Sequence, residues 1–226
     1  MNHNTGLESP WCRYLRLMEE RPQAFAPSPL LPIETDSQTV ADFTARTGQA
    51  IGVVYESRYQ IMVVDLVRGP EGLFAYERVL PAAQGDAVVA VPIWDGKFVL
   101  LEQFRHALRR CQIAFPRGFG EGKLSAEKNI CKEIQEELQS EVLAQRPLGR
   151  IAPDSGLTAG EACAILCDIT EPKPVPHYEA IQRVVCLTQT ELERQIAGGK
   201  ISDGFTLSAY TLYQTSKARY YSRIRT

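Results

Sequence analysis

The chain has 226 residues, with 25 Lys and Arg against 27 Asp and Glu, so its formal net charge is -2. A chain of this length can bury a core without disulfides or a structural metal, as one large domain or as a domain with an appendage. The near-zero charge argues against a general nucleic-acid binder or a membrane-surface binder, because both need a basic excess.

The apolar segments and the cysteines both favour a cytoplasmic protein. No segment approaches the roughly 18 consecutive apolar residues of a membrane span. Residues 1–5 lack the basic and then apolar layout of a signal peptide. The 6 cysteines include no Cys-x-x-Cys pair, and the chain has only 3 histidines. We therefore expect reduced thiols rather than disulfides or a zinc site.

The first 84 residues are expected to form an extension in two parts. In residues 1–50, the segment 11–20 has helical spacing, and the Pro-rich segment that follows predicts an extended linker. In residues 51–84, two segments rich in apolar and β-branched residues flank the turn signal Gly69-Pro70-Glu71-Gly72. This pattern predicts a β-hairpin of residues 59–67 and 73–80.

Residues 85–216 are expected to form the main domain. The apolar segments 87–94 and 97–104 flank Asp95-Gly96, which is among the strongest short-range hairpin signals. Further strands are predicted at 148–151, 161–169 and 181–187. One helix is predicted to begin near Thr188 or Thr190, which both open a capping box, and to end at Gly198-Gly199; another is predicted at 205–215. The basic residues 217–226 are expected to be a frayed tail.

The segment 118–142, GFGEGKLSAEKNICKEIQEELQSEV, predicts an acidic helix that begins near Ser125. Helical winding places Glu133, Glu136 and Glu137 on one stripe beside an apolar stripe, and residues three and four apart on a helix are neighbours. Such carboxylates repel one another unless a hard cation such as Mg²⁺ binds them. The alternative is an ordinary solvated helix face. The Gly-rich loop directly before the helix favours a site. The apolar stripe consists of Ile130, Cys131, Ile134 and Leu138.

This segment resembles the Nudix box, Gly-x5-Glu-x7-Arg-Glu-U-x-Glu-Glu-x-Gly-U, where U is a bulky aliphatic residue. Gly118 takes the first position, and residues 132–137 take the Arg-Glu-U-x-Glu-Glu core with Lys132 in place of Arg. The first Glu of the pattern falls on Leu124, and the closing Gly-U falls on Gln139-Ser140. The resemblance is therefore strong at the metal-binding core and degraded at both ends.

The resemblance extends over about residues 55 to 215 and is greatest to ADP-ribose pyrophosphatases. Residues 85–119 are similar to the part of that subfamily in which a Gln-x-Arg element, here Gln103-Phe104-Arg105, leads to a Pro-x-Gly loop, here Pro116-Arg117-Gly118. Glu161 takes the place of a loop acid that assists metal binding or acts as the general base. Glu179-Ala180-Ile181 also follows the C-terminal pattern of the subfamily.

The resemblance implies an α/β (α+β) fold, a Nudix-type α/β/α sandwich around a mixed sheet, with a β-hairpin extension that forms a homodimer. The N-terminal helix before the hairpin is expected from its residue spacing. The resemblance also implies Mg²⁺ or Mn²⁺ as the cofactor. Glu121 lies close in sequence to the missing acid and is a candidate to replace it in part. Glu161 and Glu137 are the implied catalytic residues. The implied metal ligands are Glu133, Glu136, Glu137, Glu161 and the backbone carbonyl of Arg117. The implied substrate-binding residues are Arg105, Gln103 and Gly118, with Lys132 in a supporting role.

Three functions remain open from the sequence. The first is hydrolysis of a nucleoside diphosphate linked to another moiety, such as ADP-ribose or a nucleotide sugar, to AMP and a sugar phosphate. The second is hydrolysis of a nucleoside triphosphate or dinucleoside polyphosphate. The third is a Nudix fold that binds a nucleotide and has lost catalysis. In each, Arg105 can offer a guanidinium to a phosphate, with Arg109 and Arg117 as further candidates.

Overall fold

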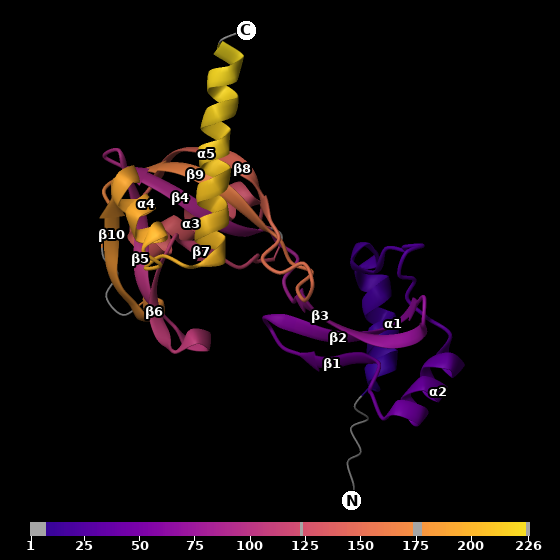
Figure 1. Cartoon of the computed structure of the whole chain (residues 1–226). Helices are drawn as coiled ribbons and strands as arrows, with labels where there is room; N and C mark the ends of the chain where they lie inside the picture. The colour runs from indigo at the N-terminus through magenta and orange to yellow at the C-terminus, as the bar shows by residue number, and fades with distance from the viewer. Residues whose placement is uncertain (1–7, 123, 174–177, 225–226) are drawn as a thin grey trace, which may run out of the picture. The chain divides into compact units, whose positions relative to one another are not determined.

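The computed structural model describes residues 8–122, 124–173 and 178–224 of the chain, which divides into two compact units (Figure 1). The first unit is Met1–Ala83 with Asp154–Gly160, and the second is Gln84–Pro153 with Glu161–Thr226. Within the described ranges, no helix combines the length and the apolar character that a membrane crossing requires. All 6 cysteines are free thiols.

The first unit contains an antiparallel sheet in the order β1-β2-β3. Strands β2 and β3 form the predicted hairpin, in register from Gln60 opposite Pro81 to Gly69 opposite Gly72. Residues 154–160 join this unit because the Val79 amide donates to Leu157 O at 2.8 Å and Val79 O accepts from the Ala159 amide at 2.9 Å. The strands are β1 (Gly52–Glu56), β2 (Gln60–Gly69) and β3 (Gly72–Pro81).

Helices cover this sheet, and one of them was not predicted from the sequence. The predicted first helix is α1 (Pro10–Glu20), and a short 3-10 turn, η1 (Pro22–Phe25), follows it. The Pro-rich segment around residues 27–32 has no helix or strand, as predicted, but helix α2 (Ser37–Thr47) follows it and was not predicted. Its end signals are ordinary: the Asp36 carboxylate accepts from the Thr39 amide at 2.8 Å, and Gly48 ends the helix with φ 73°.

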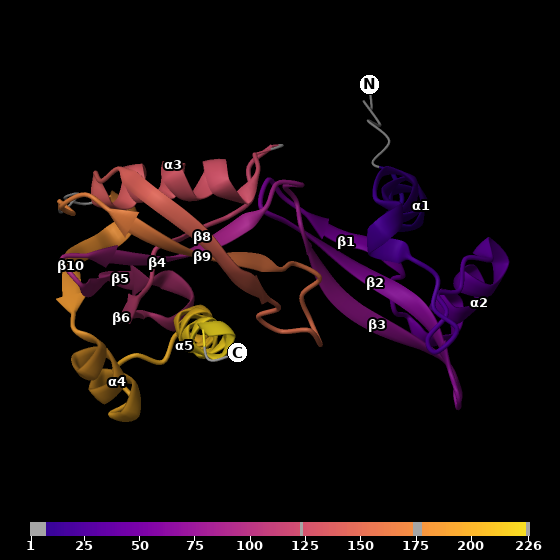
Figure 2. The same ribbon diagram turned by 90° about the horizontal axis from the view of Figure 1, so that it is seen from above.

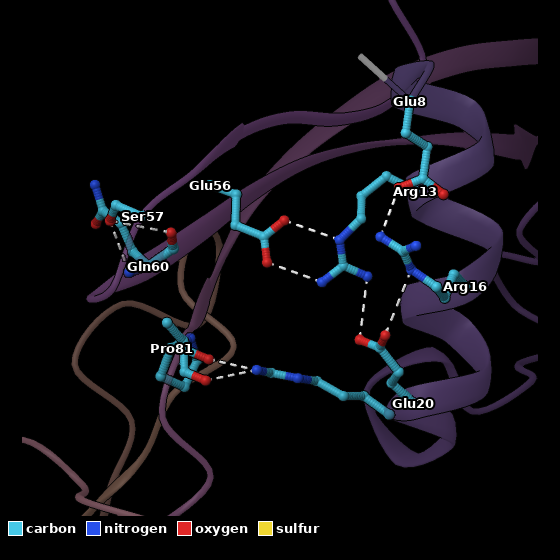
Figure 3. A network of polar contacts seen from close by, with 10 residues as sticks. Glu8, Arg13, Arg16, Glu20, Glu56, Ser57, Gln60 and Pro81 are labelled. Carbon is cyan, nitrogen blue, oxygen red and sulfur yellow. Dashed lines mark hydrogen bonds and ion pairs between the residues drawn. The ribbon is translucent and has the colours of Figure 1, made fainter. Parts of the chain in front are cut away.

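Helix α1 is joined to the sheet by buried and by surface polar contacts. The Tyr14 hydroxyl donates to the buried carboxylate of Asp65, which also accepts from Arg78. At the surface, Arg13 donates to both carboxylate oxygens of Glu56 at 2.9 and 2.8 Å (Figure 3). The buried contacts matter more for the fold, because exposed ion pairs contribute only about 0 to 1 kcal/mol.

The second unit contains a 7-stranded mixed sheet in the order β10-β5-β4-β9-β8, with β6 paired to β5 and β7 paired to β4. Strands β4 and β9 are parallel, and the other pairs are antiparallel. The strands are β4 (Ala87–Trp94), β5 (Lys97–Arg105), β6 (Arg110–Ala114), β7 (Arg117–Gly118), β8 (Val142–Ile151), β9 (Ala162–Ile169) and β10 (Ile181–Leu187), with short 3-10 turns η2 (His106–Leu108) and η3 (Tyr178–Ala180).

The hairpin of β4 and β5 opens beyond its turn. Asp95 and Gly96 have φ values of 48° and 69°, as a two-residue hairpin turn requires. The two strands pair only next to this turn, at Ile93 opposite Phe98 and Trp94 opposite Lys97. Farther along, β5 pairs with β6 and β4 pairs with β7. Residues 110–118 therefore lie between the separated ends of β4 and β5, and this arrangement positions the candidate site.

Helices cover both faces of this sheet (Figure 2). Helix α3 (Ala126–Leu138) packs on the face that carries Val88, Val99 and Leu101. Helices α4 (Gln189–Ala197) and α5 (Gly204–Ile224) lie on the other face, where Phe98 and Leu100 belong to the core. The alternation follows from the two-residue period of strands. The predicted α/β/α sandwich around a mixed sheet is confirmed.

The sequence predicted the beginning of α4 correctly and the end of α5 incorrectly. Helix α4 has the capping box of Thr188 and Glu191, with both reciprocal hydrogen bonds present. Helix α5 was predicted to end at residue 215, with a frayed tail after it. The helix instead continues to Ile224, so that part of the prediction is wrong; residues 225–226 lie outside the described part of the chain.

Candidate functional site

Helix α3 separates its three predicted acids into two environments. Glu133 and Glu137 are buried, with exposed fractions of 9% and 2%. Glu136 lies near the surface, where its carboxylate pairs with Lys132 at 3.2 Å. Lys132 also pairs with Glu121 at 2.8 Å. Lys132 therefore pairs with two acids near the surface, Glu121 and Glu136. The carboxyl groups of the other two acids of the helix, Glu133 and Glu137, are buried.

Burial makes the two inner carboxyl groups difficult to ionise. Desolvation is the main cause that raises the pKa of Glu133 to about 7 and the pKa of Glu137 to about 8. Negative charge on Glu133 adds to the shift of Glu137, and Glu179 raises the pKa of both groups. Opposing contributions come from Lys132 at Glu133, and from Arg105 and the Arg117 amide at Glu137. The pair therefore needs additional positive charge to be fully ionised at neutral pH.

Gly118 makes room for one of these carboxyl groups. A Cβ atom added at Gly118 would overlap Oε1, Cδ and Cγ of Glu133, well inside the 3.0 Å that real Cβ atoms keep. Gly118 lies in β7 opposite Val88, whose side chain packs toward α3. The glycine at the first position of the box is therefore required by close approach to Glu133, because any side chain there would fill the space of the carboxylate.

Asn129 holds the loop that precedes α3 and was not singled out from the sequence. Its side chain is fully buried, and its Nδ2 donates to Asp86 O at 2.8 Å and to Phe119 O at 2.9 Å. The loop also packs closely at Gly120, where a Cβ would overlap the backbone of Gly85. Asn129 lies three positions after Ala126 and four before Glu133, on the buried side of the helix. This helical spacing could have indicated its role, since a buried amide needs hydrogen-bond partners.

Strand β5 directs Gln103 and Arg105 to the α3 side of the sheet, the same side as Val99 and Leu101, because residues two apart in a strand share a face. Gln103 is 3% exposed, and its Nε2 donates to Glu179 O at 2.8 Å. Gln103 Oε1 and Arg105 Nε are buried and have no hydrogen-bond partner among the described residues. Burial, and then the charge of Arg117, lower the pKa of Arg105. Both predicted substrate-binding side chains thus retain unused hydrogen-bonding capacity.

The two candidate loop acids have different surroundings. Glu161 lies directly before β9, and its carboxylate accepts from Arg150 Nε at 2.7 Å. Glu179 lies in η3 with φ 43°, and its charge acts on Glu133, Glu137 and Arg105. The catalytic role of Glu161 stays a prediction. Glu179 is exposed, and it belongs to the pattern Glu179-Ala180-Ile181 but was not among the predicted site residues.

The donor set fits a divalent cation that keeps part of its hydration shell. No group of three or more His, Cys, Asp or Glu side chains in the described part of the chain is arranged to hold a metal ion by itself. Mg²⁺, however, is commonly held by one or two carboxylates together with waters and substrate phosphates. Glu133 and Glu137 supply two such carboxylates, and Glu137 Oε2 is buried without a partner in the described structure. A cation would provide the missing positive charge.

The degraded end of the box has a local structural explanation. Gln139 occupies the position of the family glycine and has φ 49°, the left-handed conformation that ends α3. Ser140 replaces the bulky aliphatic residue and is buried, and its hydroxyl contacts Leu138 O at 3.2 Å and Glu171 O at 3.3 Å. The helix end is therefore kept in the conformation that glycine favours, without glycine.

Replacing Gln139 by Gly is expected to stabilise the protein by about 1 kcal/mol, because glycine adopts positive φ without the steric cost of a Cβ atom. Urea unfolding of the two proteins at pH 7 measures the difference. Gly199 has φ 71° after α4, so Gly199→Ala is the matched opposite change and is expected to destabilise by a similar amount. A Gln139→Gly variant that is no more stable than the original would contradict this account of the helix end.

Comparisons with known proteins support the fold. No protein-family model matches the chain, and no curated protein matches it in sequence. Among solved structures, a crystal structure of an ADP compounds hydrolase is similar to this chain with a TM-score of 0.60 and 16% sequence identity, over 72% of this chain and 89% of that one. At this level of identity the likeness concerns the fold, and the chain has a Nudix-like α/β/α sandwich.

Proposed function

We propose that this protein is a metal-dependent hydrolase of a nucleoside diphosphate linked to another moiety, with ADP-ribose or a related nucleotide sugar giving AMP and a sugar phosphate. The observation that carries the proposal is the buried pair Glu133 and Glu137, whose negative charge Lys132 and Arg105 offset only in part. Glu133 also lies against Gly118, the first glycine of the Nudix-like box. The fold likeness to an ADP compounds hydrolase supports the substrate class.

In this proposal Glu133 and Glu137 hold Mg²⁺ or Mn²⁺, with Glu136 and the Arg117 carbonyl in support. When bound, the cation supplies charge neutralisation at the diphosphate and a more acidic water. Gln103 and Arg105 orient the substrate through their unpartnered polar atoms. Water attacks phosphorus, the bond from phosphorus to the bridging oxygen breaks, and a nearby carboxylate takes the proton of the water.

Glu179 is a better candidate than Glu161 for the carboxylate that takes the proton of the water. A general base must lie within hydrogen-bond reach of the water that it activates. The charge of Glu179 acts on both metal-binding candidates, and its backbone is held by Gln103. The carboxylate of Glu161 is instead bound by Arg150. We therefore assign the base to Glu179 and a smaller role to Glu161.

This assignment predicts a difference between two conservative variants. Glu179→Gln is expected to lower kcat by about 100-fold or more, because general base catalysis contributes 10²- to 10⁴-fold. Glu161→Gln is expected to change kcat by less than about threefold, because its carboxylate serves a surface ion pair. Steady-state kinetics of both variants with the same substrate measures the difference. A large loss in Glu161→Gln with normal Glu179→Gln would return the base to Glu161.

A substrate panel tests the proposed function itself. The protein is incubated with Mg²⁺ or Mn²⁺ and with ADP-ribose, nucleotide sugars, nucleoside triphosphates and dinucleoside polyphosphates, and the products are separated by chromatography. Release of AMP from ADP-ribose or a nucleotide sugar supports the proposal. Turnover confined to triphosphates or dinucleoside polyphosphates would favour the second function, and binding without turnover would favour a nucleotide-binding protein. The implied homodimer remains a prediction that light scattering can test.

A further inference from the structure

Helix α3 contacts residues 117–119 through one side chain in each of three successive turns. The three side chains are four residues apart, so they form one stripe along the helix. They meet the three consecutive backbone residues in reverse order. The contacts are Glu137 with the Arg117 amide, Glu133 with the space beside Gly118, and Asn129 with Phe119 O. The two buried carboxyl groups therefore belong to a row that a third side chain completes.

Asn129 is the uncharged member of this row, and it joins two backbone segments to the helix. Its side chain is fully buried, and Nδ2 donates to Phe119 O at 2.9 Å and to Asp86 O at 2.8 Å. Both partners are carbonyl oxygens, which only accept, so the amide nitrogen must face them. The residue before β4 and the residue after β7 are thereby held by the same turn of α3.

The two backbone segments approach each other closely where Asn129 holds them. A Cβ atom added at Gly120 would lie 1.9 Å from Gly85 O, and one added at Gly85 would lie 2.7 Å from Glu121 O. Glycine at both positions permits this approach but supplies no attraction. The hydrogen bonds of Asn129 supply attraction, and they fix the loop at the end that adjoins Gly118.

We propose that Asn129 is a positioning residue, which fixes residues 117–119 against Glu133 and Glu137 so that both carboxylates can reach one cation. This inference rests on the proposed function for the identity of the cation. The contacts of the two carboxyl groups change when they ionise and bind metal. A neutral amide that donates to two carbonyl groups keeps its contacts in both states. Asn129 therefore holds the segment in register with the helix whether or not metal is bound.

Binding of Mn²⁺ to the full chain, followed by electron paramagnetic resonance, tests this role without catalysis. Asn129→Leu and Asn129→Ala both remove the donor, and Leu keeps about the volume of the side chain. Each folded variant is expected to bind Mn²⁺ about tenfold or more weakly, the usual loss when a residue that orients metal ligands is removed. Failure of both variants to fold would assign Asn129 to the fold rather than to the site.

The matched control is Ile130→Ala, which removes a fully buried apolar side chain from the same turn of α3. This change is expected to lower the urea midpoint of unfolding, because it leaves a cavity in the core. Its Mn²⁺ affinity should stay within about twofold of the original, because the contacts to residues 117–119 remain. Loss of stability and loss of metal affinity are thereby separated.

Hydrogen exchange of the metal-free protein tests the same contact without a ligand. The Arg117 amide is bonded to Glu137, while the amides of β9 lie in the core of the sheet and report on global unfolding. Asn129→Leu is expected to raise the exchange rate at Arg117 relative to β9 by about tenfold or more, because it releases the segment locally. Ile130→Ala should not raise this ratio.

Two results would overturn the inference: unchanged Mn²⁺ affinity in a folded Asn129 variant, or an exchange ratio at Arg117 no higher in Asn129→Leu than in Ile130→Ala. Failure of the proposed function gives a different pattern. If the original protein binds no Mn²⁺ or hydrolyses no nucleotide sugar, a raised exchange ratio in Asn129→Leu would keep the positioning contact and remove the reaction. Metal-dependent hydrolysis that Asn129→Leu leaves unaffected would keep the reaction and remove the positioning role.

Discussion

Replacing Glu137 by Gln is expected to abolish hydrolysis and yet make the metal-free protein more stable at pH 8. The pKa of Glu137 is raised from 4.5 to about 8, mainly by burial. Between these values the unfolded chain is ionised and the folded chain binds a proton, so stability falls as pH rises through this window. Gln carries no such penalty, and its expected gain at pH 8 is about 4 kcal/mol.

Urea unfolding at pH 5 and pH 8 in chelator measures this effect. The control is Glu136→Gln on the same helix, whose carboxylate lies at the surface and whose change is expected to be within about 0.5 kcal/mol. Added Mg²⁺ should stabilise the original protein and leave Glu137→Gln unchanged, because a ligand stabilises only the state that binds it. If Glu137→Gln is less stable than the original protein at pH 8, burial of the Glu137 carboxyl group does not destabilise the metal-free protein, and this explanation is wrong.

The same variant reports on catalysis. Loss of one carboxylate ligand is expected to lower kcat/KM by about 100-fold or more, since metal ions supply several kcal/mol of charge stabilisation in the transition state. Higher stability together with lost activity is the signature of a functional group that the fold itself does not need. A residue required for packing would show the opposite relation, with stability and activity falling together.

Replacing Gly118 by Ala is expected to displace the Glu133 carboxylate and leave the fold largely intact. The atoms that a Cβ would overlap are the far end of a flexible Glu side chain, so the carboxylate can turn away without movement of the backbone. Gly118 does not have positive φ, and alanine adds no backbone strain there. We expect a loss of about 100-fold in kcat/KM with less than about 1 kcal/mol of destabilisation.

Gly120→Ala is the matched control in the same loop. Its Cβ would overlap the carbonyl group of Gly85, which is backbone and cannot turn away. This variant is therefore expected to destabilise the protein by about 1 to 3 kcal/mol, as overpacking does. Chemical unfolding and steady-state kinetics on both variants distinguish the two effects. A Gly118→Ala variant with full activity would contradict the role of this glycine as space for Glu133.

The acidic helix α3 shows which features a local sequence pattern can predict. Its position, the stripe of Glu133, Glu136 and Glu137, and most of the apolar stripe follow from a period of 3.6 residues, which acts within one element. Cys131, which was also predicted on the apolar stripe, is exposed. The hairpin turn at Asp95-Gly96 is equally local, because two residues with positive φ determine it. Helix α2 was missed although its end signals at Asp36 and Gly48 are of the same local kind.

Tertiary structure decided which of these residues share a site. The sequence by itself determined the sandwich class, the helix that carries the acids and the glycine before it, through propensity, periodicity and resemblance. It did not distinguish the buried Glu133 and Glu137 from the surface Glu136, because burial depends on which stripe the sheet covers. It did not show that Gln103 contacts Glu179 or that Arg117 pairs with Asp203, because strand pairing and helix packing join segments that lie far apart along the chain. The physical reason is that local patterns follow from the covalent chain, whereas charge and burial at a site are set by non-local contacts.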